Sequence, residues 1–532
     1  DGFQGGEAGE DEATRKARIS RLAQNGKEHH LTAEEFEEHL RNEREKVAAA
    51  VDRSDSPLAR GIAGLSASET PALIGASRGH IDCDVDVDAL AYWNDPQGDR
   101  DRNLQSAFVD GAVPGTDAPT KYISFQPDTG GWNNIRMSME NMFIFAASLG
   151  RTLVLPPPQP LYLLRADKKE KLRGFADFYP LQTEAFRRKV KVISMAEFLE
   201  REGSRLAIPA EDLEAQKKRA EGCVHMKKSD VFCDDLYAHL ITVGYVPELG
   251  GKSCAIFDED KFHGKVMTGA NEAKVKEFCG ERKSFFVTSE MQDSFLIHFR
   301  TSDKGYRMVN HFYGFLLFTD PVVDNYYKRF VRDFLHYRDS IYCAAGKIVK
   351  AVQEEGQSTG IVIDNEGGGG YSSLHVRRGD LQYKKVKISA QQWYDNTKEL
   401  WEPGEILYIA TDERNKTFFD PIKEHHPVRF LDDYWELAGL GDLDPNYMGM
   451  LDTIVAARGR NFAGTYFSTF TGFICRMRGY YGMSSKTCYY GLEAYKYTMH
   501  TWHQGPLHIF SHEWPTGWIG IDGDVVPSQD VF

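Results

Sequence analysis

Hydrophobic and polar positions predict a regular succession of strands and helices from about residue 120 onward. The segments KYISFQ (121–126) and RTLVLPPP (151–158) are typical of strands, and the helical spacing of apolar residues over 134–150 predicts a helix between them. Gly130 and Gly131 indicate a tight turn before this helix. The order strand, glycine turn, helix, strand is typical of a parallel α/β sheet.

A second series of this kind follows a polar, glycine-rich stretch at 358–370, which we interpret as a connector. Asp444 and Pro445 predict a helix start, because aspartate caps helices and proline suits the first helical position. Before the connector, a long helical region is expected over 322–355. The second series itself comprises YSSLHVRRGD (371–380), a helix from about 390, ILYIATDE (406–413), PVRFL (427–431) and NFAGTYFSTF (461–470).

These patterns predict an α/β protein with two serial domains around a cleft, preceded by a charged extension. The segment from Thr32 has the capping-box pattern of a helix, while 56–118 is rich in Gly, Ser, Ala and Asp and reads as a stem or a surface-draped extension. The expected parts are an extension (1–118), a first domain (119–340), a second domain (341–498) and an aromatic, histidine-rich tail (499–532).

Composition narrows the class of protein. A chain of 532 residues with 41% hydrophobic content is long enough for two or three domains. The net charge of −14 argues against nucleic acid or an anionic membrane as the main partner, and no run is long and apolar enough for a membrane span. The sequence begins at Asp1, so we expect any signal peptide or membrane anchor to lie outside it.

The eight cysteines permit disulfides without establishing a pairing. They form no C-x-x-C pair, which argues against a structural zinc site. Asn415 begins the single N-x-[ST] triplet, which is compatible with the secretory pathway. Imidazole and indole side chains crowd the tail, and we expect them to pack across the domains or line an acceptor groove rather than bind metal: His500, Trp502, His503, His508, His512, Trp514 and Trp518.

Candidate chemistry gathers at the predicted strand ends of the second domain, where open α/β sheets bind ligands. Arg377 and Arg378 follow one strand, and Ser468 and Thr469 lie between another strand and a helix. Taken singly, an arginine here could form a surface ion pair with Asp380, and Ser468 could simply cap its helix. Together they suit a phosphate, because guanidinium groups and a helix start both bind anions.

The first domain supplies DTGGWNNIR (128–136), in which Gly130 and Gly131 let a ligand approach the backbone and Asn133, Asn134 and Arg136 offer donors. This stretch matches neither the dinucleotide-binding nor the P-loop pattern. HVRRGD lacks the companion motifs of a protein kinase.

The ordered set GGWNNIR, LGRTLVLPPPQPLY, HVRRGD, IATDE and FAGTYFSTF, spread over about 120–490, resembles the GDP-fucose-dependent protein O-fucosyltransferases. It is most similar to the type that modifies thrombospondin repeats, and HVRR is also similar to α1,6-fucosyltransferases. The resemblance implies a GT-B architecture of two Rossmann-like domains, GDP-fucose as donor, a protein or glycan hydroxyl as acceptor, inversion, no metal or other cofactor, and the lumen of the secretory pathway.

The resemblance also implies roles for individual residues. Arg377 would face the β-phosphate, Asp412 would lie near the guanine or ribose, and Asn133 would reach the donor from the first domain. The remaining expected donor contacts are Gly130, Gly131, Asn134, Arg136, His375, Arg378, Asp380, Ser468, Thr469 and Phe470.

One departure concerns the general base. In the thrombospondin-repeat type a glutamate serves as base, and the matching position here is Gly130. Asp128 and Glu140 are the nearby carboxylates, and Asp128 either accepts the acceptor proton or caps the turn before Gly130. The alternatives to fucose transfer are another nucleotide-sugar transferase of GT-B type and an inactive nucleotide- or glycan-binding homologue.

Overall fold

The computed structural model describes residues 79–93, 98–109, 119–128, 130–159, 173–221, 232–249, 253–300, 302–303, 306–307, 312–362, 368–379, 386–500, 513–514, 518 and 520–522. The helix expected from Thr32 lies outside these residues, as do Asp380, Trp502, His503, His508 and His512. Among the described helices, none combines the length and apolar character that a membrane crossing needs.

The first domain is built on a parallel sheet with the strand order β3-β2-β1-β6. Its buried strands follow the predicted apolar runs, and α5 lies between β1 and β2 in the chain, as expected. The elements of this half are α4 (Gly98–Asn103), β1 (Tyr122–Phe125), α5 (Trp132–Ser148), β2 (Thr152–Leu155), α6 (Glu184–Lys189), β3 (Val192–Ser194), α7 (Met195–Glu202), α8 (Ala210–Ala220), α9 (Phe232–Val243) and β6 (Leu296–Phe299).

The same domain contains a second parallel sheet, ordered β5-β4-β9, which the sequence patterns did not predict. The helical region expected over 322–355 is two helices, because the chain leaves the helix at Leu335 and re-enters one at Asp339. The elements here are β4 (Ser253–Phe257), α10 (Glu259–Phe262), α11 (Gly269–Cys279), β5 (Lys283–Phe286), β7 (Ser302–Asp303), β8 (Tyr306–Arg307), α12 (Phe312–Phe315), β9 (Leu316–Phe318) and α13 (Pro321–Phe334). The second of the two helices, α14 (Asp339–Gln357), packs in the second domain.

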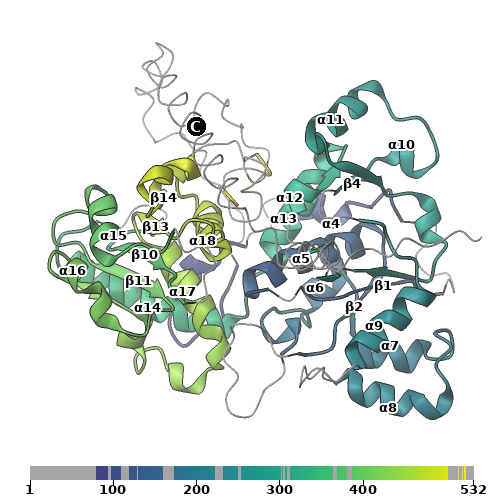
Figure 1. The fold of residues 1–532 in the computed structure, drawn as a ribbon, viewed down its shortest axis with the longest axis horizontal. Helices are drawn as coiled ribbons and strands as arrows, with labels where there is room; N and C mark the ends of the chain where they lie inside the picture. The colour runs from purple at the N-terminus through teal and green to yellow at the C-terminus, as the bar shows by residue number, and fades with distance from the viewer. Residues whose placement is uncertain are drawn as a thin grey trace, which may run out of the picture.

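The second domain has a five-stranded parallel sheet ordered β12-β11-β10-β13-β14, which confirms the predicted second βα series. Figure 1 shows it beside the first domain, with α18 next to α5. Asp444 caps a short 3-10 helix with Pro445 at its first position, as predicted. The elements are β10 (Ser372–Val376), α15 (Ala390–Thr397), β11 (Leu407–Thr411), α16 (Asp420–Lys423), β12 (Val428–Arg429), α17 (Met448–Ala457), β13 (Phe462–Gly464), α18 (Thr469–Tyr480) and β14 (Cys488–Tyr490).

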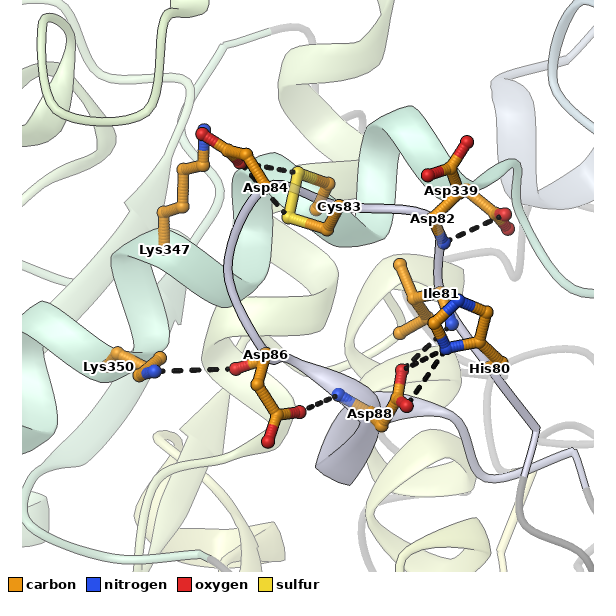
Figure 2. Close-up of a disulfide and its surroundings, with 11 residues drawn as sticks. His80, Ile81, Asp82, Cys83, Asp84, Asp86, Asp88, Asp339, Lys347 and Lys350 are labelled. Carbon is orange, nitrogen blue, oxygen red and sulfur yellow. Dashed lines mark hydrogen bonds and ion pairs between the residues drawn. A yellow bond between two sulfur atoms is a disulfide. The ribbon is translucent and has the colours of Figure 1, made fainter.

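Residues 79–93 belong to the second domain's core rather than draping over its surface. The Cys83–Cys343 disulfide joins this segment to α14 (Figure 2). Behind it, Val87 packs against Gly346, where an added Cβ would lie 2.4 Å from a Val87 methyl carbon. The Leu90 carbonyl oxygen accepts a hydrogen bond from the Tyr481 hydroxyl. Residues 79–93 of the extension therefore contribute to the stability of the second domain.

The described residues of the tail contact both domains. Trp514 packs against Gly479 of α18, and the Trp518 ring lies edge-on to Tyr480. At α13 of the first domain, Asp522 pairs with Arg332. The described residues also contain the disulfides Cys254–Cys279 and Cys475–Cys488.

Candidate active site

Three predicted site segments meet at one edge of the second-domain sheet. Because β10 pairs in parallel with both β11 and β13, the residues that follow these strands lie together. They are 377–379 after β10, 412–413 after β11 and 465–468 after β13. The edge predicted from the sequence to bind the donor is thus formed by these segments.

The Thr465 side chain fixes the end of β10 against the end of β13. Its buried hydroxyl donates to the His375 carbonyl oxygen and accepts from the Arg377 backbone N–H, at 3.0 Å in each case. The backbone of Arg377 is therefore held beside the turn that leads into α18, and the Arg377 side chain is partly exposed.

His375 adds a second connection between β10 and α18. Its Nδ1 lies 2.7 Å from the Thr471 hydroxyl, and its ring stacks on Phe470 with 4.5 Å between ring centres. Burial, followed by the positive charge of Arg377, lowers the pKa of His375 to about 3. The imidazole is neutral at physiological pH and adds no cation to the edge.

Asp412 organises the loop after β10. Its two carboxylate oxygens accept hydrogen bonds from the backbone N–H groups of Arg378, at 2.7 Å, and Gly379, at 2.9 Å. A Cβ at Gly379 would lie 2.7 Å from an Asp412 oxygen, so a larger residue here would displace this carboxylate. The structure places Asp412 in the arginine loop, where it shapes the backbone; contact with guanine or ribose stays a prediction.

The partners of the Arg378 side chain differ from those expected of an arginine that binds phosphate. Its Nε donates to Glu413 at 2.8 Å, and its guanidinium lies 3.8 Å from the centre of the Phe418 ring. A hydrogen bond from the Asn415 N–H and, after it, the one from Arg378 lower the pKa of Glu413. Of the two adjacent arginines, Arg378 is engaged on the β11 side of the edge.

The turn before α18 is strained and presents an unpaired hydroxyl. Ser468 is the N-cap residue, yet its side chain makes no capping bond and its buried Oγ has no hydrogen-bond partner among the described residues. Phe467 has a φ of 61°, in the left-handed region that non-glycine residues rarely adopt. Its ring packs on Tyr466, which stacks on Tyr495. Strain supported by packing, at the start of a helix, fits an anion site better than a simple cap.

The first-domain motif forms the turn between β1 and α5. The Asp128 side chain is fully buried, and its Oδ1 accepts a hydrogen bond from the Gly130 N–H at 2.7 Å. Gly131 is the N-cap residue of α5. In the first turn of α5, Asn134 has a buried side-chain oxygen without a hydrogen-bond partner in the described part of the chain. The geometry supports Asp128 as the cap of the turn.

Arg136 and Glu140 point away from this turn, into the contact between α5 and α18. Arg136 donates to Asn133 at 3.2 Å and to Glu140 at 2.8 Å, and it also pairs with Glu513 of the tail. The second oxygen of Glu140 accepts from Arg476 of α18 at 3.0 Å. Glu140 is therefore held between two cations, which argues against a role as the base, and the donor contact expected of Arg136 stays a prediction.

Comparison with known families identifies the family of this chain. The family model described as GDP-fucose protein O-fucosyltransferase matches residues 122–481. The chain belongs to this family. It is a glycosyltransferase that uses GDP-fucose as its donor, and its parallel sheets confirm the predicted α/β class; the GT-B arrangement stays a prediction.

Solved structures that resemble this fucosyltransferase are distant in sequence. POFUT1 in complex with GDP-fucose is 13% identical, with a TM-score of 0.34, and the match covers 71% of this chain and 99% of POFUT1. The fucosyltransferase NodZ from Bradyrhizobium is 12% identical, with a TM-score of 0.32, and the match covers 67% of this chain and 93% of NodZ. A search of curated protein sequences found no significant match.

Sequence reasoning missed several residues that shape the fucosyltransferase site. Thr465 stands inside the motif FAGTYFSTF and Thr471 directly follows it, and hydroxyls at a strand end and in the first helical turn were a usable signal. The left-handed φ of Phe467 could not be predicted from the residue type, because phenylalanine does not favour that conformation. No sequence pattern connected Glu513 with the site, because it stands 377 residues from Arg136 in the chain.

Proposed function

We propose that this fucosyltransferase transfers fucose, with inversion and without a metal ion, to a hydroxyl group of a protein or glycan acceptor. The observation that carries the proposal is the joined end of β10 and β13, where Thr465 fixes the backbone of Arg377 beside the unpaired Ser468 hydroxyl. This arrangement concentrates donors for a diphosphate at the predicted ligand edge of the sheet.

In the proposed reaction the acceptor oxygen forms a bond to the anomeric carbon of fucose while the bond from that carbon to the diphosphate oxygen breaks. The leaving electron pair places negative charge on GDP. Arg377 and the N–H groups at the start of α18 stabilise that charge as it grows, which lowers the barrier rather than only tightening binding. The acceptor proton goes to water or to a phosphate oxygen.

A donor panel tests the proposal. GDP release is measured with GDP-fucose, GDP-mannose and UDP-sugars, first alone and then with candidate glycoprotein acceptors. Turnover with GDP-fucose, whose sugar is β-linked to the diphosphate, and formation of the α-linked product support it. Turnover only with another nucleotide sugar assigns a different donor, and stoichiometric GDP binding without any turnover identifies an inactive homologue.

Transfer is expected to survive EDTA. The charge that a metal would neutralise is met in this proposal by Arg377 and the α18 start. Within the described residues, the one cluster with metal-ligand spacing is Cys83, Asp84 and Cys343, and its two cysteines form a disulfide. Rates with and without chelator check this expectation, and a loss that manganese or magnesium restores would contradict it.

Asp128→Asn is expected to leave turnover almost unchanged, because asparagine can accept the Gly130 hydrogen bond and caps turns as well as aspartate does. Loss of a general base would instead cost about 100- to 10,000-fold. Steady-state rates together with GDP binding by calorimetry distinguish the two roles. A drop of that size with intact GDP binding would restore Asp128 as the base.

We also propose that the enzyme works in the oxidising lumen of the secretory pathway. The disulfides Cys83–Cys343, Cys254–Cys279 and Cys475–Cys488 fit such a compartment, and Asn415 is exposed for glycosylation. On expression with a signal sequence, removal of N-glycans should shift the mass of the wild type but not of Asn415→Gln. Full activity of enzyme expressed in a reducing cytosol, with its cysteines as free thiols, would contradict the proposal.

A further inference from the structure

Four charged side chains are buried together where α5, α18 and the tail meet. Arg136 and Glu140 come from α5, Arg476 from α18 and Glu513 from the tail, and each side chain is at most 2% exposed. Glu140 and Glu513 each pair with both arginines, so the four groups form a closed ring of ion pairs. We call this set the interdomain ion ring.

Packing completes the interdomain ion ring and excludes water from it. The Arg136 guanidinium lies 3.8 Å from the centre of the Phe473 ring, and that of Arg476 lies 4.1 Å from Trp518. Arg476 Nε also donates to the Tyr480 hydroxyl at 2.6 Å. Two positive and two negative charges balance. Because buried charges are costly unless fully paired, the ring favours a single relative position of its parts.

The position that the ring favours matters for the reaction. The helices it joins are those whose first turns carry the donor motifs, α5 after Gly131 in the first domain and α18 after Ser468 in the second. At 1.5 Å rise per residue, Arg136 lies only about 6 Å along α5 from its start, and Arg476 about 10 Å along α18. A shift of the ring is therefore transmitted to both halves of the donor site.

We propose that Glu513 is a positioning residue for fucose transfer: by binding both arginines, this tail carboxylate holds the two donor-binding helix starts in register across the contact between α5 and α18. The inference rests on the proposed function of those helix starts. Glu513 itself belongs to neither helix, and it is the member of the ring that comes from outside the two domains' own helices. The tail thereby becomes part of the catalytic unit without contacting the donor.

The chain offers a matched control on the same tail. Asp522 pairs with Arg332 of α13 at 2.6 and 3.0 Å, and this ion pair anchors the tail to the first domain. Asp522→Asn removes a tail ion pair without touching α5 or α18. Comparison with Asp522→Asn therefore separates the effect of a less firmly anchored tail from the effect of misaligned helix starts.

The experiment compares Glu513→Gln with Asp522→Asn in the full chain, using GDP titration, thermal unfolding and the rate of GDP release from GDP-fucose. Glu513→Gln is expected to lower the rate about 10- to 100-fold, the effect of a misplacement of about 1 Å. GDP should still bind with a stoichiometry near one, and its Kd should change far less than the rate, because the second domain binds GDP. Asp522→Asn should keep the wild-type rate.

Two results would overturn the proposal. One is a lower unfolding temperature for Glu513→Gln at an unchanged rate, which would make the ring structural only, and the other is an equal loss of rate in Asp522→Asn. If Glu513→Gln does not fold, Glu513→Asp decides, because it keeps the charge but shortens the reach: we expect a lower rate with normal GDP binding, and a wild-type rate refutes the role. Arg377→Ala serves as a reference, since wild-type turnover in that variant would refute the proposed donor site itself.

Discussion

Arg377→Ala is expected to lower the rate of fucose transfer by about 100- to 1000-fold, the usual cost of losing one preorganised group that stabilises transition-state charge. Thr465 holds the Arg377 backbone N–H at 3.0 Å, so the side chain starts from a fixed point next to the α18 turn. Because the negative charge on the diphosphate grows during bond breaking, the loss should fall on kcat more than on the affinity for GDP-fucose. Steady-state kinetics measure both.

Arg378→Ala is the matched control, because it removes the same charge from the adjacent residue. The Arg378 guanidinium already pairs with Glu413 and lies on the Phe418 ring, so its removal should cost much less than that of Arg377. A rate for Arg377→Ala above about one third of wild type would remove Arg377 from the catalytic role, since a charge-stabilising group costs far more than that. Equal losses in both variants would indicate a general effect of positive charge.

Arg476→Met is expected to destabilise the protein by about 3–5 kcal/mol, the range found when one partner of a buried ion pair is removed. Both carboxylates of the interdomain ion ring, Glu140 and Glu513, would lose a cation that now lies 3.0 Å away. Methionine replaces much of the volume but leaves the ring with an excess negative charge. Thermal unfolding followed by calorimetry and by tryptophan fluorescence measures the loss.

Arg429→Met controls for the loss of an arginine ion pair as such. Arg429 donates to Glu355 at 2.8 Å, but both side chains of this pair are 36% exposed. Exposed pairs contribute about 0–1 kcal/mol, because water screens the charges. Similar shifts in unfolding temperature for the two variants would mean that the interdomain ion ring stabilises the protein no more than an exposed ion pair does.

Local patterns predicted the elements that carry the donor site. The alternation of apolar runs, the glycine pair and the prolines around 121–158 correctly gave β1, α5 and β2, because each signal lies within one turn or one strand of its structural effect. The same holds for β10, β11 and β13. The extra sheet β5-β4-β9 was missed, since its three short strands are separated by long connections and pair only in the folded chain.

The sequence by itself determined the fold class, the family and the segments that form the donor edge, because these depend on periodicity and on ordered motifs that can be read along the chain. Only the tertiary structure decided what Arg136, Glu140 and Asp412 do. Each stands in or beside a donor motif, yet Arg136 and Glu140 are bound by Arg476 and Glu513 from the far end of the chain, and Asp412 by the backbone after β10. The partners of a buried charge are set by packing, and the sequence around that charge does not contain them.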